Sequence, residues 1–135
     1  MQKLIYSLLA VLLPILSFAA IPRPMLENVE ALATMKYPIE LCMASKEYEG
    51  WTIQKQTRFI VLGAKIDTLV LKIQKHYGEK NVFDAYLFGV SRFASSEQNK
   101  KTLLNKYGSY CADKVYNEIN EMFADSESQL NKFLK

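Results

Sequence analysis

Hydrophobic residues recur at intervals of three and four along most of this chain. The longest such pattern lies in residues 52–77, and Gly78 follows as a natural C-terminal stop. Steps of three and four are the repeat of a helix that buries a single face. The pattern therefore predicts one long helix whose buried stripe is Phe59, Leu62, Ile66, Leu69, Ile73 and Tyr77.

A second interpretation of the same segment is a β-hairpin over residues 57–74. Residues 59–62 and 69–73 are rich in β-branched side chains, and a turn at 63–65 would join them. The segment lacks the Asn-Gly or Asp-Gly pair that favours a tight hairpin turn. Its long three-and-four spacing favours the helix.

Shorter apolar patterns predict helices on both sides of this segment. We expect a helix over 25–35 and a second one that begins at Pro38 and ends at Gly50. Two more helices are expected. In the first, over 82–93, Leu87 faces inward. In the second, over 97–123, Leu104 begins the buried stripe and Gly108 interrupts or tightens the helix. Ser95 is predicted to cap the latter, with Gln98 reaching back. The expected fold is all-α, a compact bundle of four or five helices.

The first nineteen residues have the pattern of a secretory signal peptide. Lys3 is followed by an apolar run of about fifteen residues, shorter than the roughly 20 that span a bilayer. Small residues at Ser17 and Ala19 place the cleavage site after Ala19. We therefore expect residues 20–135 to form a single exported domain in the periplasm or outside the cell. No other stretch predicts a membrane span.

Export determines how the two cysteines are interpreted. Cys42 and Cys111 are the only cysteines, and both fall on predicted apolar helix faces. Two lone thiols in an oxidising compartment usually pair. We therefore expect a Cys42–Cys111 disulfide that holds the early helix against the last long one, with buried free thiols as the alternative.

Composition and charge offer little support for catalysis. His76 is the only histidine, and no HExxH, GxSxG or phosphate-loop motif is present. We expect no catalytic residues, no metal and no cofactor. Lys3 is the only charged residue of the leader, so the mature chain keeps 16 basic and 14 acidic residues. That mild excess does not predict nucleic-acid binding.

Two groups of residues are candidates for binding a protein partner. Tyr48 and Trp51 flank Gly50, and aromatic side chains with a polar atom are frequent interface anchors. Ser96, Gln98 and Asn99 belong to the longest polar stretch and would form the tip of a protruding loop. The alternatives are a core aromatic pair and an ordinary helix connection.

Two short patches carry a resemblance to a known family. Cys111-Ala112-Asp113 followed by Tyr116-Asn117-Glu118, and the run of residues 40–44, resemble the half-cystine helices of periplasmic immunity proteins against type VI secretion amidase effectors. The resemblance implies a helical dimer that blocks the cleft of a secreted cell-wall amidase with a loop. The immunity protein itself would carry out no chemistry.

Two other functions remain open at this point. A periplasmic stress chaperone of the acid-activated type is also small, helical and disulfide-bonded, but should carry titrating carboxylates at an apolar seam. A secreted effector directed at a host is the other alternative. The gene neighbourhood distinguishes them, because an immunity gene lies beside its toxin gene.

Overall fold

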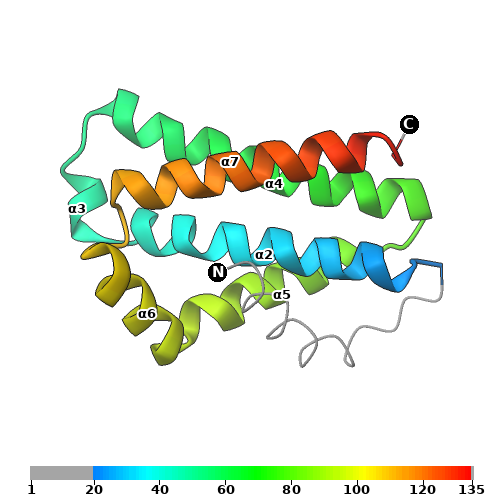
Figure 1. Cartoon of the computed structure of the whole chain (residues 1–135), viewed down its shortest axis with the longest axis horizontal. Helices are drawn as coiled ribbons and strands as arrows, with labels where there is room; N and C mark the ends of the chain where they lie inside the picture. The colour runs from blue at the N-terminus through cyan, green and yellow to red at the C-terminus, as the bar shows by residue number, and fades with distance from the viewer. Residues whose placement is uncertain (1–19, 135) are drawn as a thin grey trace.

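The computed structural model describes residues 20–134 of the chain, and the predicted signal peptide of residues 1–19 lies outside them. Within the described residues every regular element is a helix, as the sequence predicts. The helices are α2 (Arg23–Met43), α3 (Lys46–Glu49), α4 (Ile53–Tyr77), α5 (Val82–Ser95), α6 (Glu97–Tyr107) and α7 (Asp113–Asn131). Helix α2 runs through the middle of the bundle and contacts α4, α5 and α7 (Figure 1).

Helix α2 replaces the two short helices that the sequence predicts around Pro38. It continues through Pro38 as one helix of 21 residues, so the predicted break there is wrong. A proline inside a helix removes one backbone hydrogen bond and costs about 3 kcal/mol. Burial offsets that cost, because α2 is enclosed on most sides and Leu32, Ile39 and Cys42 have no exposed surface.

Helix α4 confirms the long helix and shows that the hairpin interpretation of residues 57–74 is wrong. The Thr52 side chain caps its first turn by accepting a hydrogen bond of 3.3 Å from the Lys55 N–H. Gly78 ends it in the left-handed conformation, with φ of 67°. The predicted stripe from Phe59 to Ile73 is buried, and these five side chains form the α4 side of the core.

The predicted helix over 97–123 is divided into α6 and α7. Gly108 adopts φ of 76° and its N–H donates to the Leu104 carbonyl at 2.9 Å, which closes α6. The turn at Gly108 interrupts the regular helical repeat, so the buried stripe of α7 does not extend into α6. In α6 the buried residue is Leu103, and Leu104, which was expected to begin the stripe, is exposed. The break lets the chain turn and bring Cys111 back to the end of α2.

The junction between α5 and α6 also differs from the prediction. Ser95 is the last residue of α5, and the residue that caps α6 is Ser96, whose hydroxyl accepts from the Asn99 N–H at 3.2 Å. Leu87, which was expected to face inward, is exposed on α5. The predicted cap of α6 was one residue early because Ser95 and Ser96 are equally good capping residues in the sequence.

The Cys42–Cys111 disulfide is present, as predicted. It joins the last turn of α2 to the segment before α7, with the two Cα atoms 4.9 Å apart and both residues buried. The Ser109 hydroxyl donates to Glu47 at 2.6 Å close by, so α3 is held at the same end of the bundle. The disulfide therefore ties together segments 69 residues apart in the sequence.

Candidate functional site

The two predicted aromatic anchors lie in a row of stacked rings at the disulfide end. Tyr48 is buried, and its ring centre lies 5.6 Å from that of half-buried Trp51. Trp51 in turn packs against Phe59 at 5.3 Å, and the Lys55 ammonium lies over its indole at 4.1 Å. Both rings thus fix the α3–α4 connection, and only Trp51 keeps part of its surface open to a partner.

The three predicted loop residues form the α5–α6 junction. Ser96 caps α6, and the Asn99 side-chain amide donates to the Phe93 carbonyl at 3.2 Å, while Gln98 is exposed. Figure 1 shows this junction at one end of α6 and α3 near the other end, so one helix length of about 16 Å separates the two ends. The structure therefore does not bring Ser96, Gln98 and Asn99 together with Trp51.

A buried polar cluster that the sequence pattern did not reveal joins α2, α4 and α5. The Lys36 ammonium lies 2.9 Å from both carboxylate oxygens of Asp67 and 3.2 Å from Glu40. The Tyr86 hydroxyl donates to Asp67 at 2.7 Å, and burial together with this hydrogen bond raises the pKa of Tyr86. Each group in the cluster has a partner, so we assign it a structural role.

Glu30 is the one buried polar side chain of α2 whose polar atoms make no hydrogen bond with the described residues. It is 6% exposed, and neither carboxylate oxygen has a hydrogen-bond partner within residues 20–134. Burial raises its pKa to about 7, with the nearby negative charge of Glu27 adding to the effect. We therefore expect the stability of the domain to depend on pH between about 4.5 and 7.

Helix α4 carries more exposed large apolar side chains than any other described helix. Four aliphatic side chains there are strongly exposed: Ile53 at 81%, Ile60 at 47%, Val61 at 44% and Leu71 at 43%. They lie outside the sector of the helix that carries Phe59 and Ile66, which face the core. A helix with apolar residues on both faces is normally covered on both, so this face is suited to contact another molecule.

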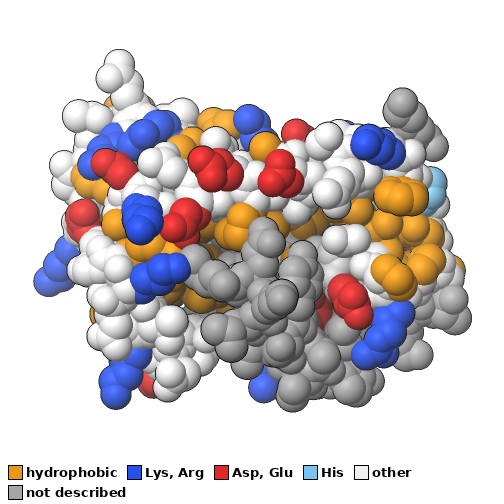
Figure 2. Space-filling view, viewed as in Figure 1, with side chains coloured by type: hydrophobic (Ala, Val, Ile, Leu, Met, Phe, Trp, Pro, Cys, Tyr) orange, Lys and Arg blue, Asp and Glu red, His pale blue; other side chains and the backbone are white. Residues whose placement is uncertain are grey.

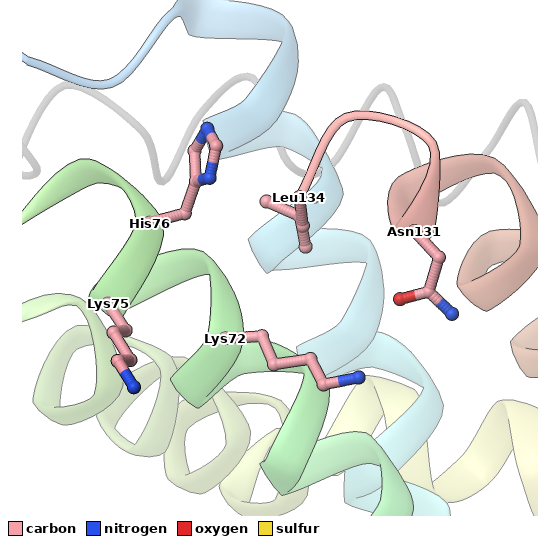
Figure 3. A pocket seen from close by; sticks show the side chains of 5 residues that line it. All are labelled: Lys72, Lys75, His76, Asn131 and Leu134. Carbon is pink, nitrogen blue, oxygen red and sulfur yellow. The ribbon is translucent and has the colours of Figure 1, made fainter.

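Two hollows lie along the α4 side of the seam with α7. The first, of about 250 Å³, is lined by Val61, Ala64, Lys65, Thr68, Leu69, Lys72 and Glu127. The second, of about 580 Å³, is lined by Lys72, Lys75, His76, Asn131 and Leu134. Lys72 belongs to both hollows and extends from α4 toward Asn131 of α7, whereas Lys75 points away from the other labelled side chains (Figure 3). The two hollows share Lys72 and follow the same seam, and we call them together the α4–α7 groove.

The two helices that border the groove carry opposite charge. Helix α4 has five basic residues and one acid, Asp67, which is taken up by Lys36. Helix α7 has five acids and one basic residue, Lys114. Figure 2 shows acidic side chains spaced along the visible surface where α7 lies, and hydrophobic side chains gathered near the C-terminal end. A partner that approaches α4 therefore meets an apolar strip flanked by positive charge.

The α4 face could have been found from the sequence. Residues 59–62 and 69–71 are consecutive apolar residues, and a helix can place only some of them in one core. The predicted stripe accounts for Phe59 and Leu62 but leaves Ile60 and Val61 unassigned. Those unassigned positions are the signal of a second apolar face.

Within residues 20–134, no group of three or more His, Cys, Asp or Glu side chains is placed to hold a metal ion. No helix in this part of the chain is both long enough and apolar enough to cross a membrane. Compared with known proteins, the chain matches no family model, no curated protein and no solved structure.

Proposed function

We propose that this chain is an exported domain that binds another protein and blocks it, as an immunity protein against a secreted cell-wall amidase does. The observation that carries the proposal is the open apolar face of α4, where Ile60, Val61 and Leu71 remain accessible on a helix whose other face fills the core. Exposed apolar strips of this kind mark protein interaction sites.

The disulfide supports the cellular compartment that this function requires. Disulfides such as Cys42–Cys111 form and persist in oxidising compartments outside the cytoplasm. A closed loop of about 70 residues contributes roughly 4 kcal/mol in the chain-entropy model, so the bridge stabilises the folded domain against unfolding. A rigid surface binds with a smaller loss of conformational entropy than a flexible one.

The charges on α4 favour a specific protein partner over the chaperone alternative. An acid-activated chaperone exposes carboxylates beside its apolar surface, so that protonation can switch it. The only acid of α4 is Asp67, and it is held by Lys36. Lys65 and Lys72 border the α4 face instead, and Glu127 of α7 is the one acid among the described residues that line the two hollows beside it.

The test is protection from a toxic neighbour. The product of the adjacent gene is sent to the periplasm of a host cell, with and without this chain, and growth is followed. We expect growth to be restored by the native chain, and the purified pair to form a complex. Cells that carry the variant Ile60→Asp/Leu71→Asp should lose protection. Cells that carry Lys101→Ala, an exposed position on α6, should keep it. A neighbour that is neither toxic nor bound would exclude the immunity function.

A further inference from the structure

The α4–α7 groove combines three properties that together define what it can bind. Its floor is apolar at Val61, Ala64 and Leu69, and Leu71 lies exposed on the same helix. Lys65 and Lys72 line the first hollow from α4, and Glu127 lines it from α7. Among the described residues, the lining of the second hollow includes Lys72 and no acid. The groove continues past Lys72 to Asn131 and Leu134, so it is elongated along the helix axis and does not close into a round pocket.

The lysines of this groove have no internal partners. None of the ion pairs formed within residues 20–134 involves Lys65, Lys72 or Lys75. By contrast, the two basic residues of the first half of α4 are engaged: Lys55 lies over Trp51, and Arg58 lies 3.7 Å from Asp113. The free positive charge of α4 is therefore concentrated beside the groove.

Charge decides among the occupants that an apolar groove of this shape could accept. A second copy related by a two-fold axis would present one of two surfaces to the groove. Its own α4 would bring lysines against lysines, and its acidic α7 has Val115, Ile119, Phe123 and Leu130 already buried in its own core, so it has no apolar side for the floor. A segment with an apolar stripe and an acidic residue would match both features if the stripe covers the apolar floor and the acid enters the second hollow, which Glu127 does not line. Amphipathic helices bind such grooves through residues spaced three or four apart.

We infer that the α4–α7 groove seats an acidic, amphipathic segment of the partner protein, with one carboxylate placed between Lys72 and Asn131. This inference rests on the proposed function and names the chemistry of its partner. Lys72 supplies the charge, and the Asn131 amide supplies a neutral donor from the facing helix, to which Lys72 extends (Figure 3). Val61, Ala64 and Leu69, which line the first hollow, receive the apolar side of the segment.

Site-specific photo-crosslinking in the periplasm tests the inference. A photoreactive amino acid is placed at Thr68, which lines the groove, and separately at Gln98 on the exposed start of α6. Crosslinked products from cells that carry the chain and its genomic neighbours are identified by mass spectrometry. We expect Thr68 to capture one protein, through a peptide that contains acidic residues beside apolar ones.

Each outcome separates the inference from the proposed function. Capture of the partner from Gln98 alone would overturn the groove assignment and leave the blocking function in place. Capture of a second copy of this chain at Thr68, or of lipid, would also overturn the groove assignment. Capture of no protein from either position would remove both proposals. Vesicles that contain phosphatidylglycerol provide the matching measurement in vitro, and binding to them through α4 would make the groove a lipid site.

Reversing the charge of the groove lysines tests the inference most directly. The variant Lys65→Glu/Lys72→Glu alters only exposed side chains, so its thermal unfolding should match that of the native chain. Its affinity for the captured partner should fall at least tenfold, and the control Lys101→Glu on α6 should leave affinity unchanged. Replacing the acids of the captured peptide by lysine should restore binding to the variant. Unchanged affinity of the double variant would overturn the inference.

Discussion

The Lys36 ammonium of α2 lies 2.9 Å from each carboxylate oxygen of Asp67 on α4, which places a paired charge inside the helix bundle. The Lys36 stem passes close to Gly63 on α4, where an added Cβ would lie 3.3 Å from the lysine side chain. The absence of a side chain at Gly63 thus gives Lys36 the room to reach Asp67. The charge pair fixes the position of α4 along α2, and with it the orientation of the outer α4 face.

Asp67→Ala should therefore destabilise the domain strongly. Removing Asp67 takes away both 2.9 Å contacts of the buried Lys36 ammonium and the acceptor of the Tyr86 hydroxyl, and it leaves Lys36 only the half-exposed Glu40 at 3.2 Å. The expected cost is about 3 kcal/mol. Denaturant unfolding measures the change. The exposed pair between Arg58 and Asp113 provides the control, and Asp113→Asn should cost under about 1 kcal/mol. If the two substitutions lower the free energy of unfolding equally, the Lys36–Asp67 pair contributes no more to stability than an exposed ion pair.

Reduction of the Cys42–Cys111 disulfide should lower the free energy of unfolding by about 4 kcal/mol, because the unfolded chain loses a closed loop of about 70 residues. Unfolding curves with and without reductant measure the difference. Alkylation of the unfolded, unreduced protein followed by mass spectrometry is the control. Two modified cysteines would contradict the disulfide.

Glu30 should make the domain more stable at pH 5 than at pH 8. Its pKa is about 7 in the folded chain and 4.5 ordinarily, so between these values the folded state holds a proton that the unfolded state releases. Unfolding is therefore easier as pH rises through this window, by up to about 3 kcal/mol. Thermal unfolding across pH measures the slope.

The variant Glu30→Met isolates this contribution. It replaces the carboxyl with an apolar side chain of similar length, so it should raise stability at pH 8 and flatten the slope between pH 4.5 and 7. Glu121→Gln on the exposed surface of α7 is the matched control and should leave the slope unchanged. A slope that survives in Glu30→Met must arise from another group.

Two glycines should respond to the same substitution with opposite sign. Gly108→Ala forces a side chain into the left-handed conformation at φ of 76° and should cost about 1 kcal/mol. Gly89 lies inside α5, where an added Cβ would meet Ala33 at an ordinary 3.6 Å. Gly89→Ala should therefore stabilise the domain by roughly 0.5–1 kcal/mol. Chemical unfolding compares both variants with the native chain, and a loss of stability in Gly89→Ala would show that α5 and α2 pack too closely there.

The sequence by itself determined the helical class, the long helix α4 and the pairing of Cys42 with Cys111. These follow from local rules: a repeat of three and four positions, a capping residue such as Thr52, a terminal glycine such as Gly78, and the scarcity of cysteine. Each rule acts within one turn of helix or on the composition of the chain, so a single sequence is sufficient to apply it.

Only the tertiary structure decided the continuity of α2 through Pro38, the division between α6 and α7, and the surface that is left open. The cost of Pro38 is local, but the burial that outweighs it comes from α4, α5 and α7, which are distant in sequence. Periodicity identified apolar positions on α4 without showing which of them would be covered. The contact of Lys36 with Asp67, and the exposure of Ile60 and Leu71, are decided only when the helices pack. Packing buries one face of each helix and leaves the other face exposed.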